Sequence, residues 1–210
     1  HLNDKGDPMN LKAYFQKMTS FNLPSSIFVD CTSSEDVAGI YEDILDSNIA
    51  IVTPNKKANS GSLKAYQQLK KTSRQRGVRF LYETNVGAGL PVINTLNDLL
   101  LSGDKVIRIE AVLSGTLNFI FSSFTGEKPF SEIVKEAKEK GYTEPDPRDD
   151  LSGTDVARKI LILSRECGLG LELADIPIQN LVPADCQGEM TTSEFLTRLK
   201  KHDAAFEVLR

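Results

Sequence analysis

The 210-residue chain has little cysteine and almost no histidine. Its three cysteines, Cys31, Cys167 and Cys186, form no Cys-x-x-Cys pair, so the sequence predicts neither a zinc site nor a disulfide framework but free thiols in a reducing cytoplasm. His1 and His202 have no second His or Cys close in sequence, and we expect them to be solvated surface residues rather than metal ligands. Such scarcity of histidine also disfavours a Ser-His-Asp or Cys-His mechanism.

Long apolar runs and clusters of positive charge are absent as well. No run approaches the roughly 20 residues that a membrane-spanning helix needs, and the polar residues 1–5 do not resemble a signal peptide. The net charge is -4 and Lys and Arg are scattered, which disfavours nucleic acid as a partner. Hydrophobic residues at 40% and charged residues at 26% are ordinary for a globular protein of one large or two small domains.

Three short apolar runs alternate with helical patterns in the first part of the chain. Each run is β-branched or aromatic and is bounded by polar residues, which is typical of a buried strand. The alternation predicts parallel βαβ units, with Ser33 as the cap of the first helix between strands. The expected strands are 27–29, 49–52 and 78–82, and the expected helices are 11–18, 33–45 and 62–75.

The pattern changes after Gly89. Pro91 suits the first turn of a helix that continues to about Leu101. In residues 105–113 apolar and polar side chains alternate, which predicts a strand in a half-exposed, antiparallel sheet. We place a domain boundary near residue 92 and expect further helices at 116–124, 131–140, 152–166 and 192–206.

A polar segment follows each of the three predicted strands, at 30–34, 53–57 and 83–89. In open α/β sheets, ligands collect at the carboxyl ends of the strands. The three segments therefore predict a nucleotide or substrate crevice. Periodicity alone leaves a second interpretation open, in which they are plain strand-to-helix turns capped by Ser and Thr.

The segment 141–159, GYTEPDPRDDLSGTDVARK, is more specific. Its glycine and prolines predict an open acidic loop, followed by a helix that starts near Ser152. Asp155 and Lys159 lie four residues apart and hence on one face of that helix. They form either a surface ion pair worth about 0.3–0.5 kcal/mol or a pair at the core boundary, where carboxylates hold a lysine and orient a polar substrate.

The segment 141–159 resembles the signature of homoserine dehydrogenases. Four other segments resemble the same family and occur in the matching order. They are VDCTSS at 29–34, TPNKKA at 53–58, ETNVGAGLP at 83–91 and SGTLN at 114–118. The resemblance covers about residues 25 to 180 and is greatest to bifunctional aspartokinase–homoserine dehydrogenases, whose kinase lies upstream. It implies NAD(P)-dependent interconversion of aspartate 4-semialdehyde and homoserine, a step toward threonine and methionine.

The resemblance also implies a fold and an assembly. The fold is α/β, with a truncated Rossmann-like parallel sheet followed by an α+β catalytic and dimerisation domain. Residues 1–92 would form a partial NAD(P)-binding domain, and residues 93–210 the catalytic and dimerisation domain. The parent enzyme would be a cytoplasmic homodimer or higher homo-oligomer that binds small-molecule substrates and neither nucleic acid nor a membrane.

Residue roles follow from the same resemblance. Lys159 corresponds to the acid–base lysine, and Lys56 to a second active-site lysine near the nicotinamide, with Lys57 as the alternative if the alignment slips by one. Glu144 and Asp155 correspond to the residues that hold the amino group and the hydroxyl-bearing end of the substrate. The other implied positions are Asp150 as a supporting acid, Thr116, Tyr142 and Gly141 in the substrate and nicotinamide pocket, Thr32 and Ser33 at the cofactor, and Glu83 with the carbonyls of Val86, Ala88 and Leu90 at a monovalent-cation site, usually sodium.

The sequence departs from this family in one respect that bears on activity. It contains no Gly-x-Gly-x-x-Gly loop for the pyrophosphate, since Gly87-Ala88-Gly89 is followed by Leu-Pro. The chain also starts after the expected first strand and ends before the family's closing segment, so we expect no activity from this chain alone. The choice between NADP and NAD stays open, because the residue that reads the ribose 2′ position is expected outside it.

Two alternatives stay open. The chain could be a non-catalytic dimerisation or assembly module of the parent enzyme, with the strand at 105–113 and its neighbouring helices as the interface. It could also be an NAD(P)-dependent reductase of a related semialdehyde. The presence of Lys56, Glu144, Asp155 and Lys159 favours the dehydrogenase over the assembly module, because dimerisation needs none of them.

Overall fold

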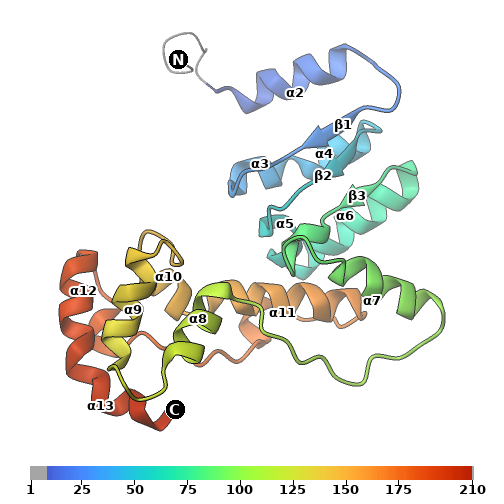
Figure 1. The fold of residues 1–210 in the computed structure, drawn as a ribbon. Coiled ribbons are helices and arrows are strands. Elements are labelled where there is room, and N and C mark those ends of the chain that lie inside the picture. The colour runs from blue at the N-terminus through green and yellow to red at the C-terminus, as the bar shows by residue number, and fades with distance from the viewer. Residues whose placement is uncertain (1–8, 210) are drawn as a thin grey trace. The chain divides into compact units, whose positions relative to one another are not determined.

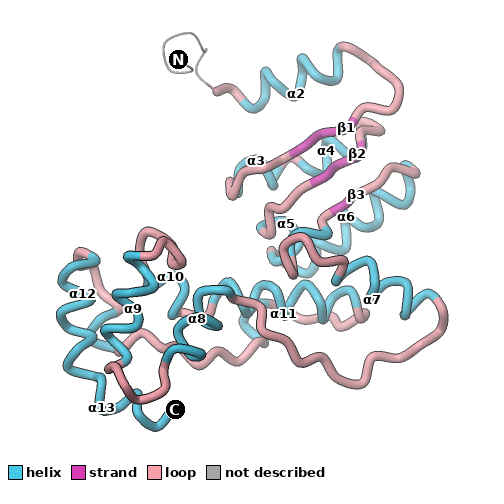
Figure 2. Tube along the Cα trace, in the orientation of Figure 1, coloured by secondary structure: helices cyan, strands magenta, loops and turns pink. Residues whose placement is uncertain are grey.

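The computed structural model describes residues 9–209 and separates the chain into two compact units, His1–Leu96 and Asn97–Arg210. Figure 1 shows the elements in chain order, and Figure 2 shows that the strands belong to the first unit. The division falls within helix α7 (Val92–Leu101), close to residue 92, where the sequence pattern changes.

The first unit contains a parallel sheet with the strand order β1-β2-β3, as the βαβ pattern predicts. Phe28 pairs with Ile51, and Ile51 pairs with Phe80. Helices lie between the strands in sequence, which is the connection that parallel neighbours require. The elements are α2 (Leu11–Ser20), β1 (Ile27–Val29), α3 (Glu35–Gly39), α4 (Tyr41–Asp46), β2 (Ala50–Val52), α5 (Lys57–Ser60), α6 (Leu63–Arg76), β3 (Phe80–Leu81) and the 3₁₀ turn η1 (Glu83–Asn85).

Helix capping follows side-chain chemistry, with one correction to the sequence analysis. The first cap is Ser34, not Ser33: its hydroxyl accepts a hydrogen bond from the Val37 amide at 3.3 Å. The predicted helix 33–45 is also divided at Ile40 into α3 and α4. Helix α6 agrees with the prediction, since Ser62 caps its start and the helix ends before Gly77, which adopts a left-handed conformation.

The sheet is buried on one face, whereas the sequence analysis expected wholly buried strands. Phe28, Ile51 and Phe80 are buried on the side where α4 and α6 lie, and α4 packs against β2 (Figure 1). The alternate side chain Val29 is 61% exposed, and Val52 and Leu81 are exposed as well. The expectation is therefore wrong for this second face, because the described helices cover only one side of a sheet that parallel topology normally covers on both.

Gly87 occupies a position where a side chain would strain the backbone and collide with Val92. Its φ is +85°, and a Cβ atom there would lie 2.5 Å from Cγ2 of Val92. We expect Gly87→Ala to lower the free energy of unfolding by about 1–3 kcal/mol, through backbone strain and this clash. Chemical denaturation would measure it, with Gly89→Ala as the control, since a Cβ on Gly89 meets nothing within 4 Å. Equal effects of the two substitutions would contradict the prediction.

The second unit is helical in its described part. Its core is centred on α9 (Phe130–Glu139), where the Phe130 ring stacks on that of Phe206 with centroids 4.0 Å apart. The predicted helix 192–206 is interrupted by a 3₁₀ turn, and the predicted acidic loop contains a short helix. The remaining elements are α8 (Gly115–Ser123), α10 (Pro147–Leu151), α11 (Thr154–Glu166), α12 (Thr192–Leu199), α13 (Asp203–Phe206), and the 3₁₀ turns η2 (Leu173–Asp175), η3 (Ala184–Cys186), η4 (Lys200–His202) and η5 (Glu207–Leu209).

The predicted antiparallel strand at 105–113 is wrong. In the part of the chain that the structure describes, these residues join no sheet, and Figure 2 shows them as loop. Ile107 is 98% exposed. Alternating side chains create a two-faced segment, but a strand also needs a neighbouring strand edge for its backbone hydrogen bonds, and no described residues supply one.

None of the helices among residues 9–209 combines the length and the apolar character needed to cross a membrane.

Candidate active site

A buried polar cluster links the ends of β1 and β2. The Asp30 carboxylate accepts hydrogen bonds from the Tyr41 hydroxyl, from the Asn55 side-chain amide at 3.0 Å and from the Thr32 backbone amide at 2.7 Å. The Tyr41 hydroxyl also lies 2.9 Å from the Thr53 hydroxyl. Because Asp30, Tyr41, Thr53 and Asn55 are all buried, each bond forms away from competing water.

The third polar segment joins the same edge of the sheet. The Asn85 side-chain amide donates to the Thr53 carbonyl at 3.1 Å, and the Asn59 amide donates to the Asn85 side-chain oxygen at 2.9 Å. The segments that follow the three strands therefore meet, as predicted. Both interpretations of them keep support, since Ser34 is also a helix cap.

The cluster favours a charged Asp30 and a neutral Tyr41. Burial by itself would raise the pKa of Asp30, but the hydrogen bonds from Tyr41, Thr32 and Asn55 outweigh it and lower the pKa. Burial and the hydrogen bond to Asp30 raise the pKa of Tyr41. Tyr41 is thus a hydrogen-bond donor at neutral pH, and the cluster holds the loops in place rather than moving protons.

Three of the predicted cofactor residues, Thr32, Ser33 and Lys56, lie in the loops that contain this cluster. Thr32 and Ser33 are exposed, and the Thr32 hydroxyl accepts a hydrogen bond from the Ser34 amide at 3.1 Å. Lys56 is half-buried at the start of α5, where its carbonyl accepts from the Ser60 hydroxyl at 2.7 Å. These side chains therefore stand at the carboxyl edge of the sheet, where ligands of α/β folds collect.

Glu83 has a structural role that the sequence analysis did not anticipate. Its two carboxylate oxygens accept from the backbone amides of Ile93 and Asn94, each at 2.8 Å, at the first turn of α7. A carboxylate at this position satisfies amides that lack a partner within the helix. Nearby, the Leu90 carbonyl accepts from the Val92 amide at 2.9 Å, and Ala88 has a φ of +53°.

In the second unit, Lys159 is held by two acceptors. Its Nζ atom lies 2.7 Å from Asp155 Oδ2 and donates to the Leu113 carbonyl, also at 2.7 Å. The side chain of Lys159 is 17% exposed and that of Asp155 is 46% exposed. The predicted contact along the helix face forms, and it lies at a partly buried position rather than on the open surface.

Hydrogen bonds among four predicted site residues stabilise the segment before α11. Asp150 accepts from the Glu144 backbone amide at 2.9 Å, and the Thr116 hydroxyl donates to the Tyr142 carbonyl at 2.6 Å. The Tyr142 ring contacts Phe119 edge-on, with centroids 4.9 Å apart. The Glu144 side chain is left exposed, and Gly141 beside Tyr142 adopts a left-handed φ of +73°.

Arg148 is a bracing residue to which the sequence analysis assigned no role. It forms an ion pair with Asp146 at 2.5 Å and donates to the carbonyls of Gly188 at 2.8 Å and Met190 at 3.0 Å. The Arg148 guanidinium lowers the pKa of Asp146. Arg148 and Asp146 both lie within the signature segment, but the two carbonyl partners are about 40 residues away, so no local signal indicates them. Tyr41 was missed for the same reason.

A parallel sheet with polar loops at the carboxyl ends of its strands is the ligand-binding arrangement of open α/β folds. Comparison with family models specifies it further: residues 2–83 match the NAD-binding domain of homoserine dehydrogenase, and residues 91–208 match the homoserine dehydrogenase domain. The chain belongs to the homoserine dehydrogenase family.

Individual relatives agree with this assignment. Over 96% of its length, the chain is 50% identical to bifunctional aspartokinase/homoserine dehydrogenase 2, chloroplastic, of Arabidopsis thaliana, and covers 22% of that protein. It is 44% identical to homoserine dehydrogenase of Schizosaccharomyces pombe, of which it covers 55%. The chain thus spans only part of the curated relatives it matches.

Solved structures agree with the family assignment. A protein of unknown function from Candida auris matches 96% of this chain, with a TM-score of 0.88 and 39% identity, and 58% of that chain is covered. A hyperthermophilic archaeal homoserine dehydrogenase in complex with NADPH matches 67% of this chain, with a TM-score of 0.61 and 30% identity, and 43% of it is covered.

Proposed function

We propose that the chain is the dehydrogenase part of an enzyme that interconverts aspartate 4-semialdehyde and homoserine with NADP or NAD. The observation that carries this proposal is the placement of Lys159, whose partly buried ammonium is aimed by Asp155 and the Leu113 carbonyl. It lies in the segment whose sequence resembles the family signature.

Lys159 is the proton donor of the proposed reaction. When bound, a nicotinamide would supply the hydride for reduction of the aldehyde. An ammonium has three N–H donors, and Asp155 with the Leu113 carbonyl occupies two of them. The proposed third contact is the substrate oxygen, on which negative charge develops and to which Lys159 delivers a proton. In the reverse direction the neutral lysine accepts the proton of the homoserine hydroxyl.

The substrate ammonium is assigned to Glu144. Its carboxylate is exposed, while its backbone amide is fixed by Asp150, so the side chain is available on a supported loop. A charge-assisted bond between carboxylate and ammonium would orient the amino-acid end of the substrate. Thr116 and Tyr142, which are joined by a hydrogen bond, are the proposed walls of this pocket.

The residues of the chain account for only part of a nicotinamide-cofactor site. The exposed Thr32 and Ser33 and the half-buried Lys56 can contact a nicotinamide and its ribose, and Gly141 is assigned to the same ligand. The sequence has no Gly-x-Gly-x-x-Gly loop for the pyrophosphate. A monovalent cation, proposed as sodium, would be bound by Glu83 and by the carbonyls of Val86, Ala88 and Leu90. The Glu83 oxygens would then contact both the cation and the α7 amides.

The proposed assembly is a homodimer or higher homo-oligomer in the cytoplasm, with an aspartokinase domain upstream in the parent chain. The name of the Arabidopsis relative gives both activities, aspartokinase and homoserine dehydrogenase, for that protein. That relative is named chloroplastic.

A second candidate function, a non-catalytic assembly module, is favoured by one observation. Residues 105–113 join no sheet among the described residues and are mostly exposed, so their backbone groups can pair with a strand from another chain.

Homoserine-dependent reduction of NADP tests the proposal. It is measured for this 210-residue chain and for a longer chain that includes a glycine-rich phosphate loop. We expect activity in the longer chain and none in the shorter. Absence of activity in both would overturn the proposed reaction and favour the assembly module or another semialdehyde substrate.

A further inference from the structure

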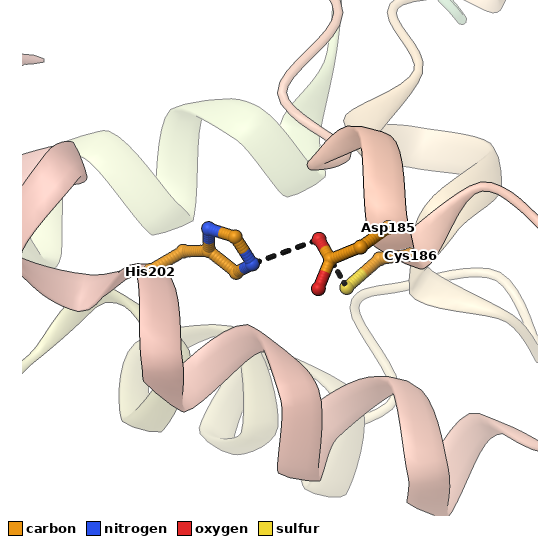
Figure 3. Close-up of side chains that lie close together, drawn as sticks. All are labelled: Asp185, Cys186 and His202. Carbon is orange, nitrogen blue, oxygen red and sulfur yellow. Dashed lines mark hydrogen bonds and ion pairs between the residues drawn. The ribbon is translucent and has the colours of Figure 1, made fainter.

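Three side chains capable of binding a metal meet in the second unit, apart from the residues assigned above. Asp185 and Cys186 belong to the turn η3 and His202 ends the turn η4, and Figure 3 shows the three side chains pointing toward one another. Their ligand atoms all lie within 4.8 Å of one another. Asp185 Oδ1 is 2.8 Å from His202 Nε2 and 3.7 Å from Cys186 Sγ.

The imidazole nitrogen is poorly satisfied by this arrangement. Nε2 of His202 is buried and, within the described residues, has no aligned hydrogen-bond partner, although it contacts the Asp185 carboxylate. A buried ring nitrogen without a bond is costly, and binding a metal through its lone pair is one way to satisfy it. The sequence analysis expected a solvated His202 without a metal role, whereas its side chain is only 31% exposed.

A ligand could reach this cluster from solvent. Asp185 and His202 line a groove of about 600 Å³ that also includes Phe206 and Leu209. Cys186 lies on the inner side, wholly buried in the hydrophobic core. The cluster therefore has a sulfur atom on the side of the core and is open to solvent through the groove.

The donor set selects a class of ion. Carboxylate, thiolate and imidazole together suit Zn²⁺ and related borderline metals, whereas Ca²⁺ and Mg²⁺ prefer oxygen alone. Tetrahedral zinc with ligands at about 2.0–2.3 Å places its donor atoms roughly 3.3–3.8 Å apart. The contact between Asp185 and Cys186 is already in this range, whereas the contact of 2.8 Å between Asp185 and His202 must lengthen by about half an ångström.

We propose that Asp185, Cys186 and His202 form a three-ligand site for Zn²⁺, with water from the groove as the fourth ligand. Cys186 binds as the thiolate and releases its proton to solvent. The ion joins η3 to η4, and so fixes the C-terminal segment that contributes Phe206 to the core.

Titration of the metal-free chain with Zn²⁺ or Co²⁺ tests this site. We expect one equivalent of Zn²⁺ to bind, and Co²⁺ to give a thiolate-to-metal charge-transfer band. At 100-fold excess over Kd, Zn²⁺ should raise Tm by roughly 5–10 °C. His202→Asn should weaken binding by about 10-fold or more, and Cys186→Ser should abolish the cobalt band.

The other two cysteines provide matched controls. Cys31→Ser and Cys167→Ser remove an exposed and a half-buried thiol outside the cluster, and both variants should keep the band and the affinity. His202→Asn keeps the inference testable if the buried Cys186→Ser variant does not fold, because His202 lies at the edge of the core. No binding to the wild-type chain, or binding unchanged in His202→Asn, would overturn the proposed site.

Discussion

Replacement of Lys159 by alanine is expected to lower the turnover of homoserine oxidation by roughly 100-fold or more. The reason is the loss of the only group assigned to accept the proton of the homoserine hydroxyl in this direction. The measurement is steady-state NADP reduction in a form of the protein that is active with homoserine. Lys159→Arg should remain impaired as well, since a guanidinium keeps the ion pair with Asp155 but stays protonated near neutral pH and so cannot accept the hydroxyl proton.

A matched control separates catalysis from a simple ion pair on a helix. Lys135 also pairs with a carboxylate one turn along its helix, Glu139 at 3.6 Å, but both side chains are exposed. Lys135→Ala should leave turnover unchanged and alter stability by no more than about 0.5 kcal/mol. Near-normal turnover in the Lys159→Ala variant would remove that lysine from the mechanism.

Asp30→Asn is expected to lower the free energy of unfolding by about 2–4 kcal/mol. The amide has the same shape but only one acceptor oxygen, whereas the Asp30 carboxylate accepts from Tyr41, Thr32 and Asn55. At least one buried donor therefore loses its partner. Urea denaturation at neutral pH measures the change, with Asp46→Asn as the control, because the exposed pair between Asp46 and Arg76 contributes little.

The effect of Asp30→Asn should depend on pH. The pKa of Asp30 is lowered in the folded chain, so its charged form stabilises the fold above the unfolded pKa of about 4. This contribution is lost as the pH falls through the folded pKa. The difference between the wild-type chain and the variant should therefore be full at neutral pH and shrink below about pH 4. A difference that is constant across this range would contradict the role given to the charge.

The local elements were largely predictable from the sequence. Short β-branched or aromatic runs predicted β1, β2 and β3, and the alternation with helices predicted their parallel order. The limits of α6 followed from Ser62 and Gly77, because caps act through the nearest backbone groups. Asp155 and Lys159 were expected to meet for the same reason, since four residues make about one helical turn.

Contacts between distant residues were not predictable in this way. Alternation at 105–113 indicated a strand, but pairing depends on a neighbouring edge that no local pattern encodes. The sheet face with Val29 and Leu81 was expected to be buried, and its exposure depends on which elements cover it.

The sequence by itself determined the family, most of the helices and the three strands of the sheet, because these follow from local pattern and composition. Only the tertiary structure decided that Tyr41 bonds to Asp30 and that Arg148 braces the signature segment. It alone placed His202 beside Cys186, since side chains distant in sequence meet only where the packing of whole helices brings them together.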